Sequence, residues 1–290
     1  MAMIKWAELR EEEFEDAVKK SDGLCLVPVG CYEMHGQHLP VRTDVYEAEA
    51  ITEAAAELET AVVFPAFEFG AVSGLVEWKG AVRLEPHLML DLLECYCTEI
   101  ARNGFDKIML VNYHGGNMGF LGYFSSMLSY KYRNFSAITV FPSTPIPTIY
   151  EAVKKEGLAS YPELTEEDLD VMREFVEDQH VSGHGCMVET CLMLHIRPDL
   201  VRMDRLGTVD GLPTHKGDRI GEAGAGTDGW LLNFPNSYCA TDPVRSTANI
   251  GRLILRLSAE HVAKTARIFK EDNKYFVEQR EKKRPYYPNN

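Results

Sequence analysis

Apolar runs alternate with helical patterns over the first 140 residues, and this alternation constrains the fold more than any other feature of the chain. Four of the runs have the length and composition of strands buried on both faces, and they occupy residues 24–30, 60–70, 107–117 and 136–142. Helical patterns precede or separate them, at 7–20, 43–59, 86–104 and then to about Tyr132. Such alternation forms βαβ units with parallel strands, so the sequence predicts an α/β fold with a mainly parallel sheet.

The rest of the chain is less regular. A mixed insertion at about 143–180 begins with prolines and continues as two short acidic helices, which we expect to cover an active site or to contact another subunit. The apolar run at 187–196 fits a helix or a strand, and the glycine-rich residues 205–240 favour irregular loops. A long amphipathic helix pattern covers 246–273. Because no internal repeat or low-complexity segment divides the chain, we expect a single domain over 1–290.

Charge and the distribution of apolar residues exclude several classes of partner. The formal net charge of -14 argues against nucleic acid, whose phosphates require a basic face. No apolar run approaches the ~20 residues needed to span a bilayer, and the acidic N-terminal segment lacks a signal-peptide core. The seven cysteines are odd in number and scattered, which favours free thiols in a reducing compartment. We therefore expect a cytoplasmic protein that acts on a small molecule, with no nucleic-acid or membrane partner.

Metal-competent side chains gather just after the first buried apolar run, in the stretch GCYEMHGQHLPVRTD. Glu33 and His35 are two positions apart, so in an extended segment they point to the same side. Asp44 opens the helical pattern at 43–59, where on its own it would be explained as an N-terminal cap. Two carboxylates and an imidazole beyond a buried strand are costly to bury without a cation. We therefore predict a metal site at Glu33, His35 and Asp44.

A second cluster follows the third apolar run. His114 in NYHGGN precedes Gly115 and Gly116, and glycines allow the backbone to approach a ligand closely. The alternative is a turn whose histidine only caps the next helix. We expect Asn117 to orient this turn or to donate to a substrate. Because ligands collect where parallel strands end, His35 and His114 lie where a functional site is expected.

The third cluster is SGHGCMVET, which contains His184 and Glu189. A histidine between glycines on a loop, five residues before a carboxylate, fits a general acid or base beside a ligand. We therefore take His184 and Glu189 as candidate catalytic residues. Trp78 and Trp230 lie in glycine-rich loops and are candidates for a pocket wall.

Together these clusters resemble the motifs of the creatininase (creatinine amidohydrolase) family. The family pattern P-x-G-x-x-E-x-H-G-x-H-L-P-x-x-T-D matches PVGCYEMHGQHLPVRTD at every fixed position. The later family motifs N-G-H-G-G-N and H-A-G-x-x-E-T-S correspond to NYHGGN and HGCMVETC, and ATDPVRSTANIG resembles a further segment near the end. The correspondence keeps the same order over residues 24–260.

The resemblance implies a metallohydrolase with a two-metal site on a three-layer sandwich whose central sheet is mainly parallel. It also implies a homo-oligomer, usually a hexamer. Carried over by motif position, Glu33, Asp44 and His114 would bind one metal, and His35 and Asp44 would share a second. His38 belongs to the motif and would support the loop that carries the ligands.

The sequence departs from the family pattern at the second metal and in the pocket wall. A family carboxylate two residues after the motif histidine is Gly116 here, so we expect Glu189 to supply that ligand. Positions that align with a Glu-His pair, with F-P-G-T and with an acidic residue after His-Ala-Gly also differ, and they are Gly74 and Leu75, Trp78 to Ala81, and Met187. Creatinine itself is therefore not the expected substrate.

Residues and resemblance together predict hydrolysis of a C–N bond, in a cyclic or linear amide, by metal-activated water. Mixed nitrogen and oxygen ligands favour zinc, with manganese or iron as alternatives, at one or two ions per subunit. His184 would pass a proton to the leaving group, with Glu189 as a ligand or as its partner. The expected substrate pocket comprises Trp78, Gly115, Gly116 and Asn117. Two rivals remain: hydrolytic opening of a keto-cyclitol ring at a C–C bond, as in a 3-dehydro-scyllo-inosose, and a non-enzymatic metal-binding protein.

Overall fold

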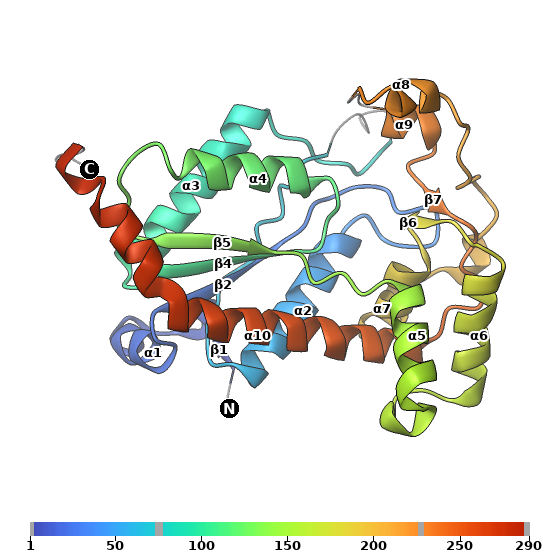
Figure 1. The fold of residues 1–290 in the computed structure, drawn as a ribbon, viewed down its shortest axis with the longest axis horizontal. Helices are drawn as coiled ribbons and strands as arrows, with labels where there is room; N and C mark the ends of the chain where they lie inside the picture. The colour runs from blue at the N-terminus through green and yellow to red at the C-terminus, as the bar shows by residue number, and fades with distance from the viewer. Residues whose placement is uncertain (1–2, 73–77, 226–228, 287–290) are drawn as a thin grey trace.

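A parallel sheet of five strands forms the centre of the computed structural model, which describes residues 3–72, 78–225 and 229–286 (Figure 1). The strand order is β1-β3-β2-β4-β5, and each pair of neighbours runs parallel. The strands are β1 (Ile4–Lys5), β2 (Leu24–Val29), β3 (Val62–Val63), β4 (Lys107–Asn112) and β5 (Ser136–Val140). The prediction of an α/β fold with a mainly parallel sheet is confirmed.

Alternate residues of the central strands face two different layers of helices. Leu24 and Leu26 of β2 pack with Met109 of β4 into one buried cluster. The residues between them, including Cys25 and Val27, pack into another. Because successive side chains of a strand point to opposite faces, an uninterrupted apolar run can serve both layers. The result is the expected three-layer sandwich, with helices on either side of the sheet (Figure 1).

The first layer contains the helices that carry site residues. It consists of α2 (Thr43–Leu58), α7 (Met187–Ile196) and the long α10 (Ala248–Glu281). A Cβ added at Gly251 of α10 would lie 1.9 Å from the carbonyl oxygen of Cys191 in α7, so the two helices touch backbone to backbone. The opposite layer consists of α1 (Phe14–Lys20), α3 (Pro86–Arg102) and α4 (Asn117–Met127).

The insertion at 143–180 forms two helices, α5 (Ile146–Glu156) and α6 (Glu166–Glu177), which pack against each other near the N-terminal end of α10 (Figure 1). Polar groups of α6 and of the segment before it fasten the insertion to α10. Asp168 accepts from Thr247 Oγ1 at 2.6 Å and from Asn249 Nδ2 at 3.0 Å. Glu163 forms an ion pair with Arg256. The segment therefore packs on the body of the protein.

The glycine-rich region 205–240 is mainly irregular, as expected, but it contains α8 (Asp218–Glu222) and α9 (Trp230–Asn233). A small antiparallel pair joins β6 (Ser182–His184) to β7 (Cys239–Ala240). Short 3-10 turns complete the structure at Trp6–Glu8, Glu11–Glu13, Leu158–Ser160, Pro198–Leu200, Met203–Arg205 and Arg284–Tyr286. Within the described ranges, no helix combines the length and apolar character that crossing a membrane requires.

Several boundaries differ from the predictions. The apolar run at 60–70 pairs as a strand only at Val62–Val63, followed by a single bridge from Phe67 to Val29. Pro65 lies between them and has no N–H to donate to a neighbouring strand. The helix predicted over 7–20 is regular only from Phe14.

Candidate metal centre

The site lies beyond the carboxyl ends of β2 and β4, where parallel sheets collect ligands. Glu33 and His35 follow β2, and His114 follows β4. Asp44 is the second residue of α2. A Cβ added at Gly30 would lie 2.7 Å from the backbone nitrogen of Val45, so a glycine at the end of β2 allows the first turn of α2 to come this close. This contact places Asp44 beside the strand ends.

A first group of side chains surrounds Asp44 Oδ2. His114 Nδ1 lies 3.0 Å from this oxygen and 3.1 Å from Glu33 Oε1. Cys31 Sγ lies 3.1 Å from the same Asp44 oxygen. The candidate ligand atoms of Cys31, Glu33, Asp44 and His114 all lie within 4.8 Å of one another. The structure therefore brings together the three residues predicted for the first metal and adds a thiol.

A second group uses the other oxygen of Asp44. His35 Nε2 lies 3.0 Å from Asp44 Oδ1, and Glu189 completes a set whose ligand atoms are again within 4.8 Å. Glu189 is oriented by the N-terminus of α7, where its Oε2 accepts from the backbone N–H of Gly185 at 2.6 Å and of Cys186 at 3.2 Å. Asp44 thus belongs to both groups, as the motif comparison predicts.

In each of the three histidines at this site, one ring nitrogen is within hydrogen-bond distance of a backbone carbonyl oxygen. His35 Nδ1 is 3.1 Å from Glu33 O, His114 Nε2 is 3.0 Å from Ala71 O, and His184 Nε2 is 2.7 Å from Met34 O. A carbonyl only accepts, so each of these nitrogens carries the proton. The opposite nitrogen of each ring then faces a carboxylate oxygen. In metal sites this arrangement presents an imidazole lone pair to the cation.

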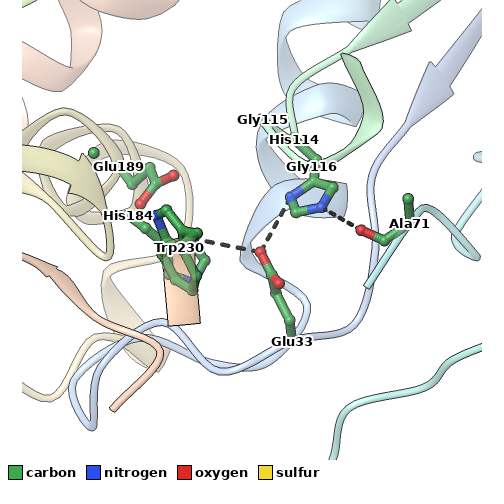
Figure 2. Close-up of a pocket in the computed structure, with 9 residues that line it drawn as sticks. Glu33, Ala71, His114, Gly115, Gly116, His184, Glu189 and Trp230 are labelled. Atoms are coloured by element: carbon green, nitrogen blue, oxygen red, sulfur yellow. Dashed lines mark hydrogen bonds and ion pairs between the residues drawn. The ribbon is translucent and has the colours of Figure 1, made fainter. Parts of the chain in front are cut away.

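His184 stands beside both groups. Its Nδ1 is 3.5 Å from Glu33 Oε1, so this carboxylate lies between His114 and His184 (Figure 2). The rings of His184 and His35 are 4.2 Å apart, and the Trp230 ring packs edge-on at 5.4 Å. His184 is 8% exposed, so it contacts the cluster and still reaches the cavity.

Burial and charge oppose each other at these groups. Burial alone would raise the pKa of Asp44, but the imidazoles of His35 and His114 hold it well below its usual range. Burial likewise raises the pKa of Glu33, and His114 reverses the shift so that the net change is downward. Burial lowers the pKa of His35, yet the Asp44 carboxylate brings it up to about 10. For Glu189 burial prevails over the nearby imidazoles, and its pKa is raised. Positive charge at the imidazoles thus stabilises the carboxylates of Asp44 and Glu33, which is the role that a metal cation takes in such clusters.

An open cavity of about 380 Å³ gives access to these groups (Figure 2). Its wall is formed by Glu33, Ala71, His114, Gly115, Gly116, Gly183, His184, Glu189 and Trp230. Gly115 and Gly116, two of the residues predicted for the substrate pocket, therefore line this cavity.

Two other pocket predictions differ from the structure. Trp78 lines a separate cavity with Met34 and packs in a small apolar cluster with Cys31. Trp230, the other tryptophan that was predicted for the wall, lines the metal cavity. Asn117 is fully buried and does not line the cavity, but it has one of its two predicted roles, since it orients the turn by accepting from Ala71 N through Oδ1 at 2.7 Å. Gly74 and Leu75, which replace the family's Glu-His pair, lie outside the described residues.

Cys31 is the site residue that sequence reasoning missed. It was assigned to a set of free thiols, and it is free, but its position two residues before Glu33 was the available signal. His38 lies outside both groups. Its Nε2 is 2.9 Å from Thr190 Oγ1, which ties the ligand-bearing loop to α7.

The comparison with known proteins agrees with the family resemblance of the sequence motifs. The family model for creatinine amidohydrolase matches residues 7–266. A creatinine amidohydrolase from Pseudomonas putida is 26% identical over 211 residues, which cover 69% of this chain and 74% of the relative. A mycofactocin precursor peptide peptidase from Mycolicibacterium smegmatis is 29% identical over 189 residues, which cover 63% of this chain and 62% of the relative.

Solved structures share the fold. A mutant creatininase described as the Zn-Zn type superposes with a TM-score of 0.65 at 24% identity, over 92% of this chain and 98% of that one. A structure described as creatininase Mn gives a TM-score of 0.66 at the same identity and coverage. With a family model that matches most of its length, this chain belongs to the creatininase family of hydrolases.

Proposed function

We propose that the protein is a metal-dependent hydrolase that cleaves the C–N bond of an amide, with a substrate other than creatinine. The observation that carries the proposal is the set of buried imidazole nitrogens that face carboxylate oxygens at 3.0 to 3.1 Å around Asp44. Such contacts require either extra protons or a shared cation.

The donor set fits one or two divalent ions. Glu33, Asp44 and His114 would hold the first, and His35, Asp44 and Glu189 the second. Nitrogen and oxygen donors suit zinc best, with manganese or iron as alternatives, and relatives described with Zn and Mn support this choice. When bound, such an ion lowers the pKa of coordinated water to about 7 and so provides hydroxide at neutral pH.

The protein's own groups would move the proton. In amide hydrolysis, the oxygen of water bonds to the carbonyl carbon, the C–N bond breaks and the leaving nitrogen takes up a proton. His184 has its Nε2 proton committed to Met34 O, so its unprotonated Nδ1, which lies 3.5 Å from Glu33 Oε1, can accept a proton and deliver it to that nitrogen. The backbone at Gly115 and Gly116 borders the cavity, where its N–H groups can stabilise negative charge on the carbonyl oxygen.

The names of two relatives support a substrate among small amides and peptides. One acts on creatinine and another on a precursor peptide, according to their names. In this chain Trp230 packs against His184 in the cavity wall, and Gly116 stands where the family has a carboxylate. We therefore expect linear amides to be better substrates than creatinine.

The test combines metal analysis with a substrate panel. Freshly purified protein should contain one or two transition-metal ions per chain, and a chelator should abolish hydrolysis until zinc or manganese is restored. The panel contains short peptides, creatinine and other cyclic amides, and an inosose. Metal-free protein with full activity would refute the proposal. Cleavage of the inosose alone would favour ring opening at a C–C bond, and full biological function of His184→Ala would favour a non-enzymatic role.

We also propose that residues 1–290 form one domain, with 143–180 as an insertion, and that the protein is a cytoplasmic homo-oligomer. Leu24 of the sheet, Val171 of the insertion and Leu253 of α10 belong to one buried cluster, which supports a single domain. Family membership supports a hexamer. Light scattering after size-exclusion chromatography would measure the assembly, and one cooperative unfolding transition by calorimetry would support the single domain.

A further inference from the structure

A second cavity adjoins the candidate metal centre. It has a volume of about 470 Å³ and shares Gly115, Gly183 and Glu189 with the metal cavity. Two of the three shared residues are glycines, so the border between the cavities carries little side-chain bulk. Each cavity lies within the ~300 to 1,000 Å³ that is usual for small-molecule sites.

The wall of the second cavity is mainly apolar. Its apolar members are Phe141, Pro145, Ile146, Pro147, Phe175 and Val188. Tyr113, Cys186 and the uncharged hydroxyls of Ser143, Thr144 and Ser182 also line it. His180 also lines it, with its ring stacked on Phe175 at 5.4 Å between centroids. Among the described residues of this wall there is no lysine or arginine. The lining thus suits an uncharged apolar group and offers no cation to a carboxylate or phosphate.

The insertion 143–180 supplies much of this wall, through the start of α5 and the end of α6. Helix α10 holds it in place. Besides the contacts of Asp168 with Thr247 and Asn249, Ser258 Oγ donates to Pro142 O at 3.0 Å. Because buried hydrogen bonds fix the wall from behind, the cavity is formed before a ligand arrives.

We propose that the second cavity is a specificity subsite for a large apolar side chain of the substrate, best an aromatic one. The inference rests on the proposed function: the scissile amide lies at the metal cavity, and the neighbouring substituent crosses the Gly115–Gly183 border. The substrate class is then a linear amide, such as a short peptide with an aromatic residue beside the cleaved bond. A single small ring would leave the second cavity unfilled.

Gly115 provides a variant at the border of the two cavities, and the binding of a small ligand that reaches only the metal shows whether the metal cavity is kept. An added Cβ meets no atom within 4 Å, and its φ is outside the left-handed region, so a larger side chain is compatible with the backbone. Leucine there would occupy the border of the two cavities. Gly119 is the matched control, because it is also exposed with no atom within 4 Å of an added Cβ and lines neither cavity.

The experiment measures the binding of two hydroxamic acids to the full-length zinc-loaded protein by calorimetry. Acetohydroxamic acid reaches only the metal, whereas 3-phenylpropanohydroxamic acid adds a phenyl group of side-chain size. For wild type and Gly119→Leu we expect the phenyl compound to bind more tightly by on the order of 100-fold, the scale on which apolar pockets discriminate. In Gly115→Leu we expect this ratio to fall below about 5-fold.

The outcomes separate the two claims. Equal binding of the two compounds by wild type, or an unchanged ratio in Gly115→Leu, would overturn the subsite even if the protein hydrolyses peptides. A large ratio that Gly115→Leu removes supports the subsite, and hydrolysis of acetyl-Gly-Phe over acetyl-Gly-Ala or acetyl-Phe-Gly over acetyl-Ala-Gly then supports the proposed function. The same ratio without hydrolysis of any amide would overturn the function alone. No binding of either compound would overturn both.

Discussion

Asp44 offers the sharpest perturbation of the candidate metal centre. Its two oxygens face different partners, since Oδ1 lies 3.0 Å from His35 and Oδ2 lies 3.0 Å from His114. Asparagine keeps the shape but replaces one oxygen with an N–H donor and removes the charge. Whichever way the amide turns, one group loses an acceptor and both lose a shared anion. We therefore expect Asp44→Asn to bind neither ion.

The stabilisation of the folded protein by bound metal can be estimated from the linkage between ligand binding and unfolding. A free metal concentration of 100 times the dissociation constant stabilises the folded state by about 2.7 kcal/mol per site, or about 5 kcal/mol for two. A chain of this size shifts its Tm by about 2 to 4 °C per kcal/mol, so zinc should raise the Tm of metal-free wild type by roughly 10 to 20 °C. Asp44→Asn should shift by less than about 3 °C, and Glu189→Gln, which spares the first group, by about half the wild-type value.

Differential scanning calorimetry with buffered zinc measures the shifts, and elemental analysis counts bound ions. The control is Asp91→Asn, a change at an exposed aspartate of α3. It should behave as wild type. If Asp44→Asn retains one full equivalent of zinc and half of the shift, Asp44 is not shared by two ions and the geometric reasoning fails.

Three further predictions concern stability. Burial, with a smaller contribution from His35, lowers the pKa of His38 to about 4, so the unfolded chain binds more protons between that pH and ~6.5. The free energy of unfolding of metal-free protein should therefore fall by up to about 3 kcal/mol as the pH drops through this window, and urea titrations of His38→Gln should show a flatter profile. Glu47 is fully buried, neither oxygen has a hydrogen-bond partner among the described residues, and burial raises its pKa well above the usual value. A raised carboxyl pKa gives stability that is lost as the pH rises, so Glu47→Met should stabilise by about 1 to 3 kcal/mol at pH 8 and by less at pH 5, and no gain at pH 8 would contradict this. Gly251→Ala should cost about 3 kcal/mol or more in chemical denaturation because its Cβ would meet Cys191 O, whereas Gly122→Ala, with open space around it, should change stability by less than about 1 kcal/mol.

The sequence predicted the strands and helices that have a clear hydrophobic pattern or a helix-favouring composition. The strand at Leu24–Val29 and the helix at Thr43–Leu58 follow from an unbroken apolar run and from an alanine-rich pattern. The short edge strand Ile4–Lys5 could not be predicted, because two residues that pair only with Val62 and Val63 leave no periodicity.

In the candidate site, too, some residues carried a sequence signal and others did not. The motif spacing identified Glu33, His35, Asp44 and His114, which lie close to strand ends. Sequence could not identify the carbonyls of Ala71 and Met34 that set the histidine tautomers, because any residue offers a carbonyl. Sequence named both Trp78 and Trp230 for the pocket wall and could not say that only Trp230 lines the metal cavity, since two tryptophans in glycine-rich loops differ only in where those loops run.

The division of the centre into two groups has a consequence during protein synthesis. Cys31, Glu33, Asp44 and His114 all belong to the first 114 residues, whereas Glu189 is added 75 residues after His114. At about 5 to 20 residues per second, a nascent chain holds every side chain of the first group for roughly 4 to 15 s before the second group can be completed. In the proposed two-metal centre, the group that contains the thiol would therefore meet cellular metal before the second group is complete.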